Sequence, residues 1–256
     1  EDDEQNFMWF ARNDRKLDVD VIQSIVGRGI SLLASNAGGL TVTPESVALD
    51  IGVGLNRANF RFAVTRGGAP VQNARVEFYL KGSTSIELMS DRTVTTNVTG
   101  NATISFRAVG AAGTDATILA VASEGNDHAS ANVVVTLVEV SGVTLLPNVI
   151  PADGAATSAA AAIVTPVGRP LTWTIQGNAL GCAIDPATGA IAAGNVGGTI
   201  TVRATHVPSG AYADGVLTLV RVENVTLTPS TITSDGVSTS SATATVAPAG
   251  RPLTWS

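Results

Sequence analysis

The sequence is poor in the residues on which many enzymes and binding proteins depend. Its 256 residues include one cysteine, Cys182, and two histidines, while charged residues make up 14% and aromatic residues 4%. A single cysteine cannot form a disulfide within the chain, and two distant histidines without nearby cysteines do not form a zinc pattern. Lys and Arg number 15 against 21 Asp and Glu, which argues against a nucleic-acid partner because phosphate contacts need clustered cations.

Motifs that signal catalysis or ligand binding are also missing. The sequence contains no P-loop, no dinucleotide-binding fingerprint and no Gly-x-Ser-x-Gly nucleophile turn. No apolar run has the length of a transmembrane helix. No loop collects the carboxylates that a calcium site needs, and we predict that Asp153 and Asp235 form turns instead. We therefore expect no catalytic residue, no cofactor-binding residue and no metal site, and predict that the chain is not an enzyme.

What the sequence does contain favours strands. Thr and Val are frequent, and β-branched side chains fit a pleated surface. Between residues 40 and 138, about seven short stretches alternate apolar and polar residues and are separated by Gly, Pro and Asn turns. These stretches are 40–43, 59–65, 74–80, 93–96, 102–106, 116–121 and 131–138. The pattern indicates a single β-sandwich or barrel.

The second half of the sequence is a repeat. The motif Gly-Arg-Pro-Leu-Thr-Trp at residues 168–173 returns at 250–255, and Asp153-Gly154 returns as Asp235-Gly236, both 82 residues later. This spacing is close to the length of one sandwich domain. We predict a full repeat at 139–221 and the start of a further, incomplete repeat at 222–256. Because half a sandwich cannot bury its apolar face, we expect the natural chain to continue.

Each copy of the motif ends in a tryptophan, Trp173 and Trp255. Leu171, Trp173 and Ile175 alternate along a predicted strand and therefore point to one face. One interpretation is a platform on which a carbohydrate stacks. The favoured interpretation is that both tryptophans are core residues that mark the fold.

Two parts of the chain resemble bacterial immunoglobulin-like (Ig-like) domains. The hairpin at residues 68–78, the turn at 95–102 and the strand region at 114–122 are similar to the invasin and intimin type. Residues 184–191 and 199–205 resemble a second class of bacterial Ig-like domain, which is found in intimins and in phage tail proteins. The resemblance implies an all-β protein of tandem Ig-like β-sandwiches, with an Ig-like domain of the invasin type at 40–138.

Residues 1–39 differ from the rest of the sequence. They hold an aromatic cluster of Phe7, Trp9 and Phe10, and Ile22, Ile25 and Val26 recur at helical spacing, which predicts a short helix around residues 15–26. The acidic start does not fit a signal peptide, so we expect that a leader has been removed or that the sequence begins inside a longer chain.

We predict that residues 1–39 form a docking segment that binds a protein partner, within a homo-oligomer or a larger assembly. The alternative is that the segment folds back on the first sandwich or is a ragged domain end.

These observations favour a structural or adhesive protein, with Ig-like repeats that form a stalk projecting from a bacterial surface or filament. Its location would be extracellular or at the cell surface, and a host or surface receptor is a possible partner. One alternative is a structural component of a phage virion, in a tail, a collar or a capsid decoration. A third hypothesis is an accessory module of a secreted enzyme.

Overall fold

The computed structural model describes residues 39–82 and 84–255, which form two compact units. Unit 1 comprises residues 39–49, 54–109 and 115–135, and unit 2 comprises residues 50–53, 110–114 and 136–255. The predicted helix around residues 15–26 lies outside the described residues. So do the predicted docking residues Phe7, Trp9, Phe10, Ile22, Ile25 and Val26.

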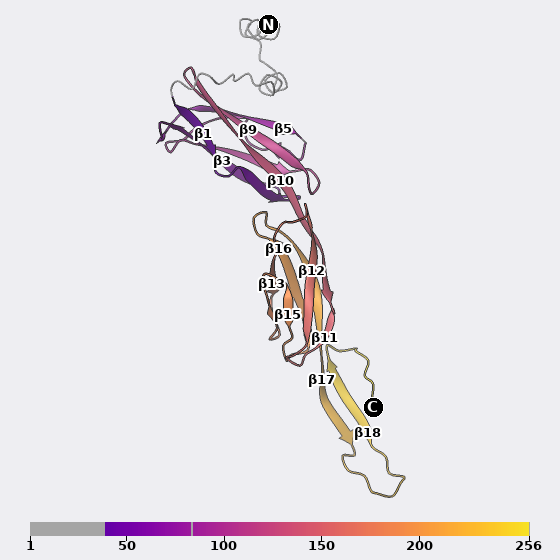
Figure 1. Ribbon diagram of the computed structural model, residues 1–256. Coiled ribbons are helices and arrows are strands. Elements are labelled where there is room, and N and C mark those ends of the chain that lie inside the picture. Colours follow the sequence, from indigo (N-terminus) through magenta and orange to yellow (C-terminus); the bar gives the residue numbers. More distant parts are fainter. Residues whose placement is uncertain (1–38, 83, 256) are drawn as a thin grey trace. The chain divides into compact units, whose positions relative to one another are not determined.

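Unit 1 is built from strands (Figure 1). They are β1 (Leu40–Pro44), β2 (Ala48–Gly52), β3 (Ala58–Arg66), β4 (Ala69–Pro70), β5 (Arg75–Gly82), β6 (Ile86–Leu88), β7 (Thr93–Thr95), β8 (Asn101–Ala108), β9 (Asp115–Glu124) and β10 (Asp127–Leu146), where β2 and β10 also contribute residues to unit 2. One sheet has the strand order β1-β3-β8-β6, with β4 paired to β3. In the other sheet β7, β5, β9 and β10 are neighbours, and β2 pairs with β10.

The two sheets of unit 1 enclose a core of large aromatic and β-branched side chains. Along β3, Phe60, Phe62 and Val64 are buried while their neighbours are more exposed, as expected for a strand with one face in the core. The ring of Phe62 lies 5.2 Å from that of Phe60 and 5.6 Å from that of Phe78 on β5, centroid to centroid. The second contact joins the two sheets, so unit 1 is a sandwich.

Besides residues 50–53 and 110–114, unit 2 contains the last part of β10 and the strands that follow it. These are β11 (Val149–Pro151), β12 (Thr157–Thr165), β13 (Thr172–Gln176), β14 (Ala183–Ile184), β15 (Ala190–Ala192), β16 (Gly198–His206), β17 (Ala211–Thr228) and β18 (Ser241–Ala247). Within this unit, β10, β12, β15 and β14 are consecutive neighbours in one sheet. The other sheet has the order β11-β17-β16-β13, and β11 runs parallel to β17.

The strand order identifies the fold. In an Ig sandwich, the first, second, fifth and fourth strands form one sheet, and the third, sixth and seventh strands form the other. Counting from β10 and leaving out the short edge strand β11, the order β10-β12-β15-β14 opposite β13-β16-β17 is this arrangement. Throughout the described residues the regular secondary structure is strand, without a helix. The prediction of an all-β protein with Ig-like sandwiches is therefore confirmed.

Two predicted connections, at residues 138–142 and 220–224, lie inside strands of unit 2. The sequence predicts that strand runs nearly into strand at residues 138–142 and 220–224, and both segments lie inside single strands, β10 and β17. Each connection contains a bulge, between Ser141 and Thr144 in β10 and between Glu223 and Thr226 in β17. Gly142 and Asn224 have positive φ at these bulges, a conformation that glycine and asparagine tolerate best.

The first half of the second repeat is a hairpin of β17 and β18. Its pairs Val222↔Val246 and Leu227↔Ala242 repeat, 82 residues later, the pairs Val140↔Val164 and Leu145↔Ala160 between β10 and β12. The hairpin therefore copies the register of the first repeat, including its bulge. The domain boundaries at 40–138, 139–221 and 222–256 remain predictions.

Candidate functional site

The first copy of the repeated motif ends at Trp173, which is buried in the core of unit 2. It lies on β13, where Trp173 and Ile175 pack inward and Thr174 is exposed. Its backbone N–H donates to the carbonyl of Pro186 at 2.9 Å. The indole is therefore enclosed by the sandwich, and in this copy it offers no surface on which a sugar ring would stack.

A tight turn at residues 185–189 closes over the indole. The carboxylate of Asp185 accepts hydrogen bonds from the backbone N–H groups of Ala187 and Thr188, and these contacts lower its pKa. Gly189 ends the turn with a φ of +73°. A Cβ at this position would lie 3.0 Å from the ring of Trp173. Glycine is therefore required both by the positive φ and by the lack of room for a side chain.

In the second copy the equivalent tryptophan has a different environment. Trp255 follows the same five residues but is exposed. The hairpin of β17 and β18 supplies the strands that precede it, whereas the first copy surrounds Trp173 with β15, β16 and β17 as well. The exposure of Trp255 thus follows from an uncovered hairpin face rather than from a different local sequence.

Arg169 of the same motif takes part in a cluster of charged groups within unit 2. Its Nη2 donates to Oδ1 of Asp50 at 2.9 Å, and Oδ2 of Asp50 lies 3.7 Å from Nε2 of His206. The Nδ1 atom of His206 is 2.8 Å from Oγ of Ser209. This cluster cannot be predicted from the sequence, because Asp50 and Arg169 are 119 residues apart.

His206 is only 1% exposed, and its burial lowers its pKa below the ordinary value. The Asp50 carboxylate opposes this shift, and the Arg169 guanidinium adds to it. Burial therefore favours the neutral form of the imidazole. Although Ser209, His206 and Asp50 are residue types of a hydrolytic triad, Ser209 also accepts the backbone N–H of Ala211 and closes a turn, which is a structural role.

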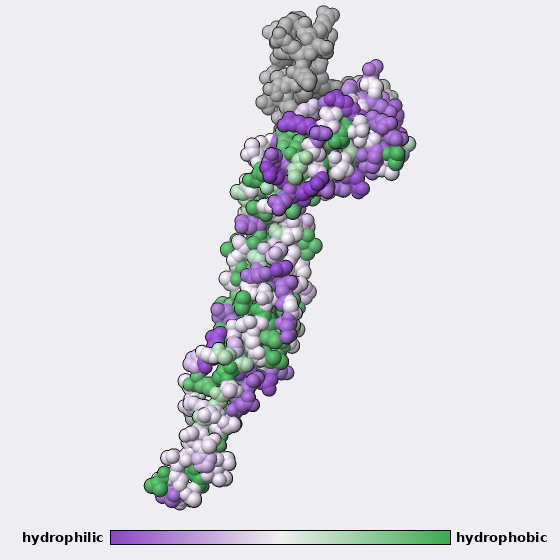
Figure 2. Space-filling model, turned by 180° about the vertical axis from the view of Figure 1, so that it is seen from behind, coloured by the Kyte–Doolittle hydropathy of each residue, from purple (hydrophilic) through white to green (hydrophobic). Residues whose placement is uncertain are grey.

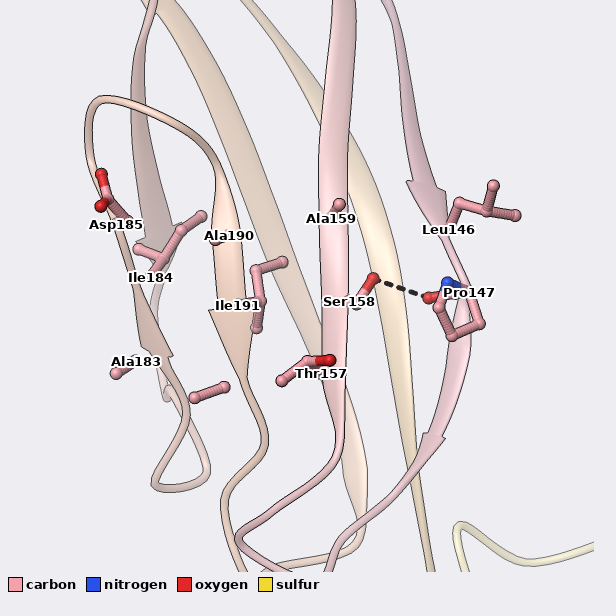
Figure 3. A pocket seen from close by; sticks show the side chains of 11 residues that line it. Leu146, Pro147, Thr157, Ser158, Ala159, Ala183, Ile184, Asp185, Ala190 and Ile191 are labelled. Atoms are coloured by element: carbon pink, nitrogen blue, oxygen red, sulfur yellow. Dashed lines mark hydrogen bonds between the residues drawn. The ribbon is translucent and has the colours of Figure 1, made fainter.

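An open groove of about 650 Å³ lies on the outer face of the sheet formed by β10, β12, β15 and β14 (Figure 3). Four of its eleven lining residues are alanines: Ala159 on β12, Ala183 on β14, and Ala190 and Ala192 on β15. The hydroxyl of Ser158 donates to the carbonyl of Pro147 at 2.7 Å, drawn as the dashed line. The groove thus presents mainly apolar side chains, the hydroxyls of Thr157 and Ser158, and the carboxylate of Asp185, which already accepts two backbone N–H groups of its turn.

Metal ligands do not gather anywhere in residues 39–82 and 84–255, where no three His, Cys, Asp or Glu side chains are grouped to hold an ion. Asp153 and Asp235 form turns, as predicted: the carboxylate of Asp153 accepts from Ala155 and Ala156, and that of Asp235 from Val237 and Ser238. In the same part of the chain, no helix has the length and apolarity that crossing a membrane requires.

No protein-family model and no curated protein matches the sequence. Among solved structures, the chain is similar to a C-terminal fragment of intimin in complex with the intimin-binding domain of its receptor Tir, at 17% identity and a TM-score of 0.44. This match covers 71% of the chain and 64% of the fragment, so the chain spans less than two thirds of that protein.

Two further structures extend the comparison. Invasin, described as a bacterial integrin-binding protein, matches at 17% identity and a TM-score of 0.29, over 79% of this chain and 45% of that one. The D0-D1 domain of intimin matches at 16% identity and a TM-score of 0.31, over 70% and 96%. Because these scores are low, the fold assignment rests on the strand order described above.

Proposed function

We propose that the chain is a non-enzymatic structural or adhesive protein, in which Ig-like repeats form a stalk projecting from a bacterial surface or filament. The observation that carries this proposal is β17, one strand that serves the first repeat and the second hairpin without a linker between them. A flexible linker would let successive repeats swing freely, whereas a shared strand favours a semi-rigid spacer.

Contacts at this connection support the same role. A Cβ on Gly197 would lie 2.7 Å from the carbonyl oxygen of Ala247 on β18, so the loop that carries Gly197 lies against the hairpin with no room for a side chain. Arg221 donates from its guanidinium to the carbonyl of Asn195 in the same loop. Backbone and side-chain contacts therefore both join the first repeat to the hairpin.

The spacer role is tested by NMR alignment of unit 2. We expect residual dipolar couplings from β16 and from β18 to fit a single alignment tensor in the natural chain. A variant with four Gly-Ser residues inserted between Val222 and Glu223 should need two tensors, because the shared strand is then broken. Two independent tensors in the natural chain would refute the semi-rigid stalk.

The docking role of residues 1–39 is a separate part of the proposal. We expect the full chain to form oligomers or to bind an assembly partner, and the triple variant F7A/W9A/F10A to lose that association because its apolar contact area is removed. Light scattering coupled to size-exclusion chromatography measures both states. A monodisperse monomer, with this aromatic cluster protected from solvent within its own chain, would contradict docking.

The proposed location and receptor are tested with cells that produce the protein. We expect the protein in the cell-surface or extracellular fraction, with a host or surface protein as the receptor in the adhesive form of the proposal. Recovery in purified phage particles would favour the virion alternative instead. A catalytic domain on the same polypeptide would favour the enzyme accessory module.

A further inference from the structure

The outer face of the sheet formed by β10, β12, β15 and β14 in unit 2 is apolar, whereas the solvated face of an antiparallel sheet is usually polar. Leu146 on β10 is 81% exposed and Ile163 on β12 is 62% exposed. The positions beside them are exposed alanines, namely Ala159, Ala161, Ala190 and Ala192. On the side of the molecule seen in Figure 2, the surface of unit 2 carries more apolar and intermediate residues and fewer hydrophilic ones than that of unit 1.

The second copy of the repeat shows that the fold does not require this apolar face. Its hairpin of β17 and β18 has the register of β10 and β12. At four outward positions, however, it carries hydroxyl side chains: Leu146 corresponds to Thr228, Ala159 to Ser241, Ala161 to Thr243 and Ile163 to Thr245. The inward positions between them are unchanged, because Ala160, Ala162 and Val164 return as Ala242, Ala244 and Val246. A contact outside the sandwich explains why only the outward positions differ.

The relief of this face is complementary to itself. Leu146, Ala159 and Ala190 form one row across β10, β12 and β15, because each is the register partner of the next. Figure 3 shows Leu146 at one side of the groove of about 650 Å³ and Ala183 of β14 at the other. Each row therefore descends from a leucine ridge on β10 to an alanine floor on β15 and β14.

A twofold axis parallel to the strands would bring the ridge of one copy onto the floor of another. For two such faces in contact, this axis places β10 opposite β14 of the other copy, and β12 opposite β15. Leu146 of each copy then lies over Ala183 and Ala190 of the other. An axis in the same plane but at right angles to the strands would place β10 opposite β10 and leave both alanine floors empty.

Charge also favours a second copy as the occupant. Residues 140–146 of β10 and the strands β12, β14 and β15 contain no charged residue, and their outward polar side chains are hydroxyls. A charged partner would gain no ion pair here, and two copies meet without like charges although the net charge of the chain is −6. Asp185 follows β14, so the axis separates the two Asp185 carboxylates by three strand spacings. This distance of about 14 Å exceeds the screening length of about 8 Å.

The size of the face predicts that the pairing is weak. Four strands about 4.8 Å apart, and the nine residues of β12 at about 3.3 Å each, span at most about 570 Å² per copy. A standard stable interface buries about 800 Å² per partner, so this contact belongs to the weak and reversible class. Copies held close together on one support would pair far more readily than free copies.

We propose that two copies of this chain pair side by side through the outer sheet faces of their units 2. The strands of the two copies run in the same direction, and Leu146 of each copy lies over the alanines of the other. The interface does not use residues 1–39, so the inference is independent of the proposed docking segment and of any receptor.

Sedimentation equilibrium of the full chain tests the pairing. The F7A/W9A/F10A background removes association through residues 1–39, and we expect a monomer–dimer equilibrium with a dissociation constant between about 10 μM and 1 mM. In the same background, L146T/A159S/A161T/I163T gives the face the hydroxyl side chains of the second copy and should raise this constant at least about tenfold. V216T is the matched control: Val216 is 58% exposed on β17, in the opposite sheet, and its substitution should leave the constant unchanged.

Two further measurements separate a lost contact from a lost fold and test the orientation. L146D changes an exposed side chain, so it should abolish the dimer without changing the melting temperature of the monomer. In a mixture of methyl-labelled and unlabelled natural chain, isotope-filtered nuclear Overhauser effects should connect Leu146 of one copy with Ala190 of the other.

Three results would overturn the proposal. The first is a monomer at every concentration up to about 1 mM. The second is a dimer whose dissociation constant is the same in the fourfold variant and in L146D as in their background. The third is a dimer in which Leu146 contacts Leu146 of the other copy instead of the alanines, because the strands would then not be related by the proposed axis.

Discussion

At the scale of single residues, Trp173 and Trp255 offer an internal comparison, because the same motif places one in a core and the other in solvent. We expect W173A to lower the free energy of unfolding of unit 2 by about 3–5 kcal/mol, the usual cost of emptying a buried aromatic site. W255A should change it by less than about 0.5 kcal/mol. Denaturant titration of both variants measures the difference, and equal losses would mean that Trp255 is packed in solution.

Asp153 provides a prediction about pH. Hydrogen bonds from the backbone of Ala156 and Ala155 lower its pKa, so its ionised form stabilises the folded state above the unfolded pKa of about 3.9. This contribution is lost as the pH falls through the folded pKa. We expect D153A to melt below the natural chain at pH 7 and to approach it in strong acid. D153N keeps the acceptor oxygen and is the control: it should lose less at pH 7, and a loss equal to that of D153A would contradict the turn.

At the scale of elements, the turn at residues 185–189 depends on a glycine for two separate reasons. In G189A the new Cβ would meet the ring of Trp173 at 3.0 Å and the carbonyl of Ala160 at 3.1 Å, at a φ of +73°. We expect a loss of about 2–4 kcal/mol, combining overpacking with backbone strain. G168A is the control, since it has a similar φ of +84° but open space around it, and should cost only about 1 kcal/mol. Thermal unfolding measures both variants, and equal shifts would exclude a packing effect.

His206, at the end of β16, should make the stability of unit 2 depend on pH. Because burial lowers its pKa in the folded state, the unfolded chain takes up the proton first as the pH falls below about 6.5. Stability that is present above this value is then lost as the pH decreases toward the folded pKa. We expect unit 2 to be less stable at pH 5 than at pH 7.5, and H206Q to flatten this dependence. If the stability of H206Q depends on pH as that of the natural chain does, groups other than His206 cause the dependence.

The strands also show how much of the fold can be predicted from the sequence. Alternation along 59–65 and 102–106 predicts β3 and β8 because one face of each strand is buried, so period two is imposed on the sequence. The two-residue strands β4 and β14 carry no such signal because they are too short to alternate. The ion pair of Arg169 with Asp50 was beyond prediction for a different reason, since only the folded chain brings residues 119 apart into contact.

At the scale of the whole molecule, the two compact units each have their own core. In unit 1 the core contains the contact between Phe62 and Phe78, and in unit 2 it surrounds Trp173. We expect F62A to lower the free energy of unfolding of unit 1 by about 3–5 kcal/mol and so to lower the midpoint temperature of one calorimetric transition. W173A should lower the midpoint of another transition, that of unit 2. The two variants therefore serve as controls for each other. A single transition that both variants shift equally would show that the units unfold together.

The exact recurrence of register and bulge constrains how such a chain changes in length over evolution. Since strand faces alternate with period two, gain or loss of an odd number of residues within a strand would turn its apolar side outward. Recombination between copies offset by 82 residues leaves each pair in phase, because Leu227 then takes the place of Leu145 and Asn224 that of Gly142. Length in this protein is thus expected to vary in whole repeats, and variants that differ by other amounts should be rare among natural sequences.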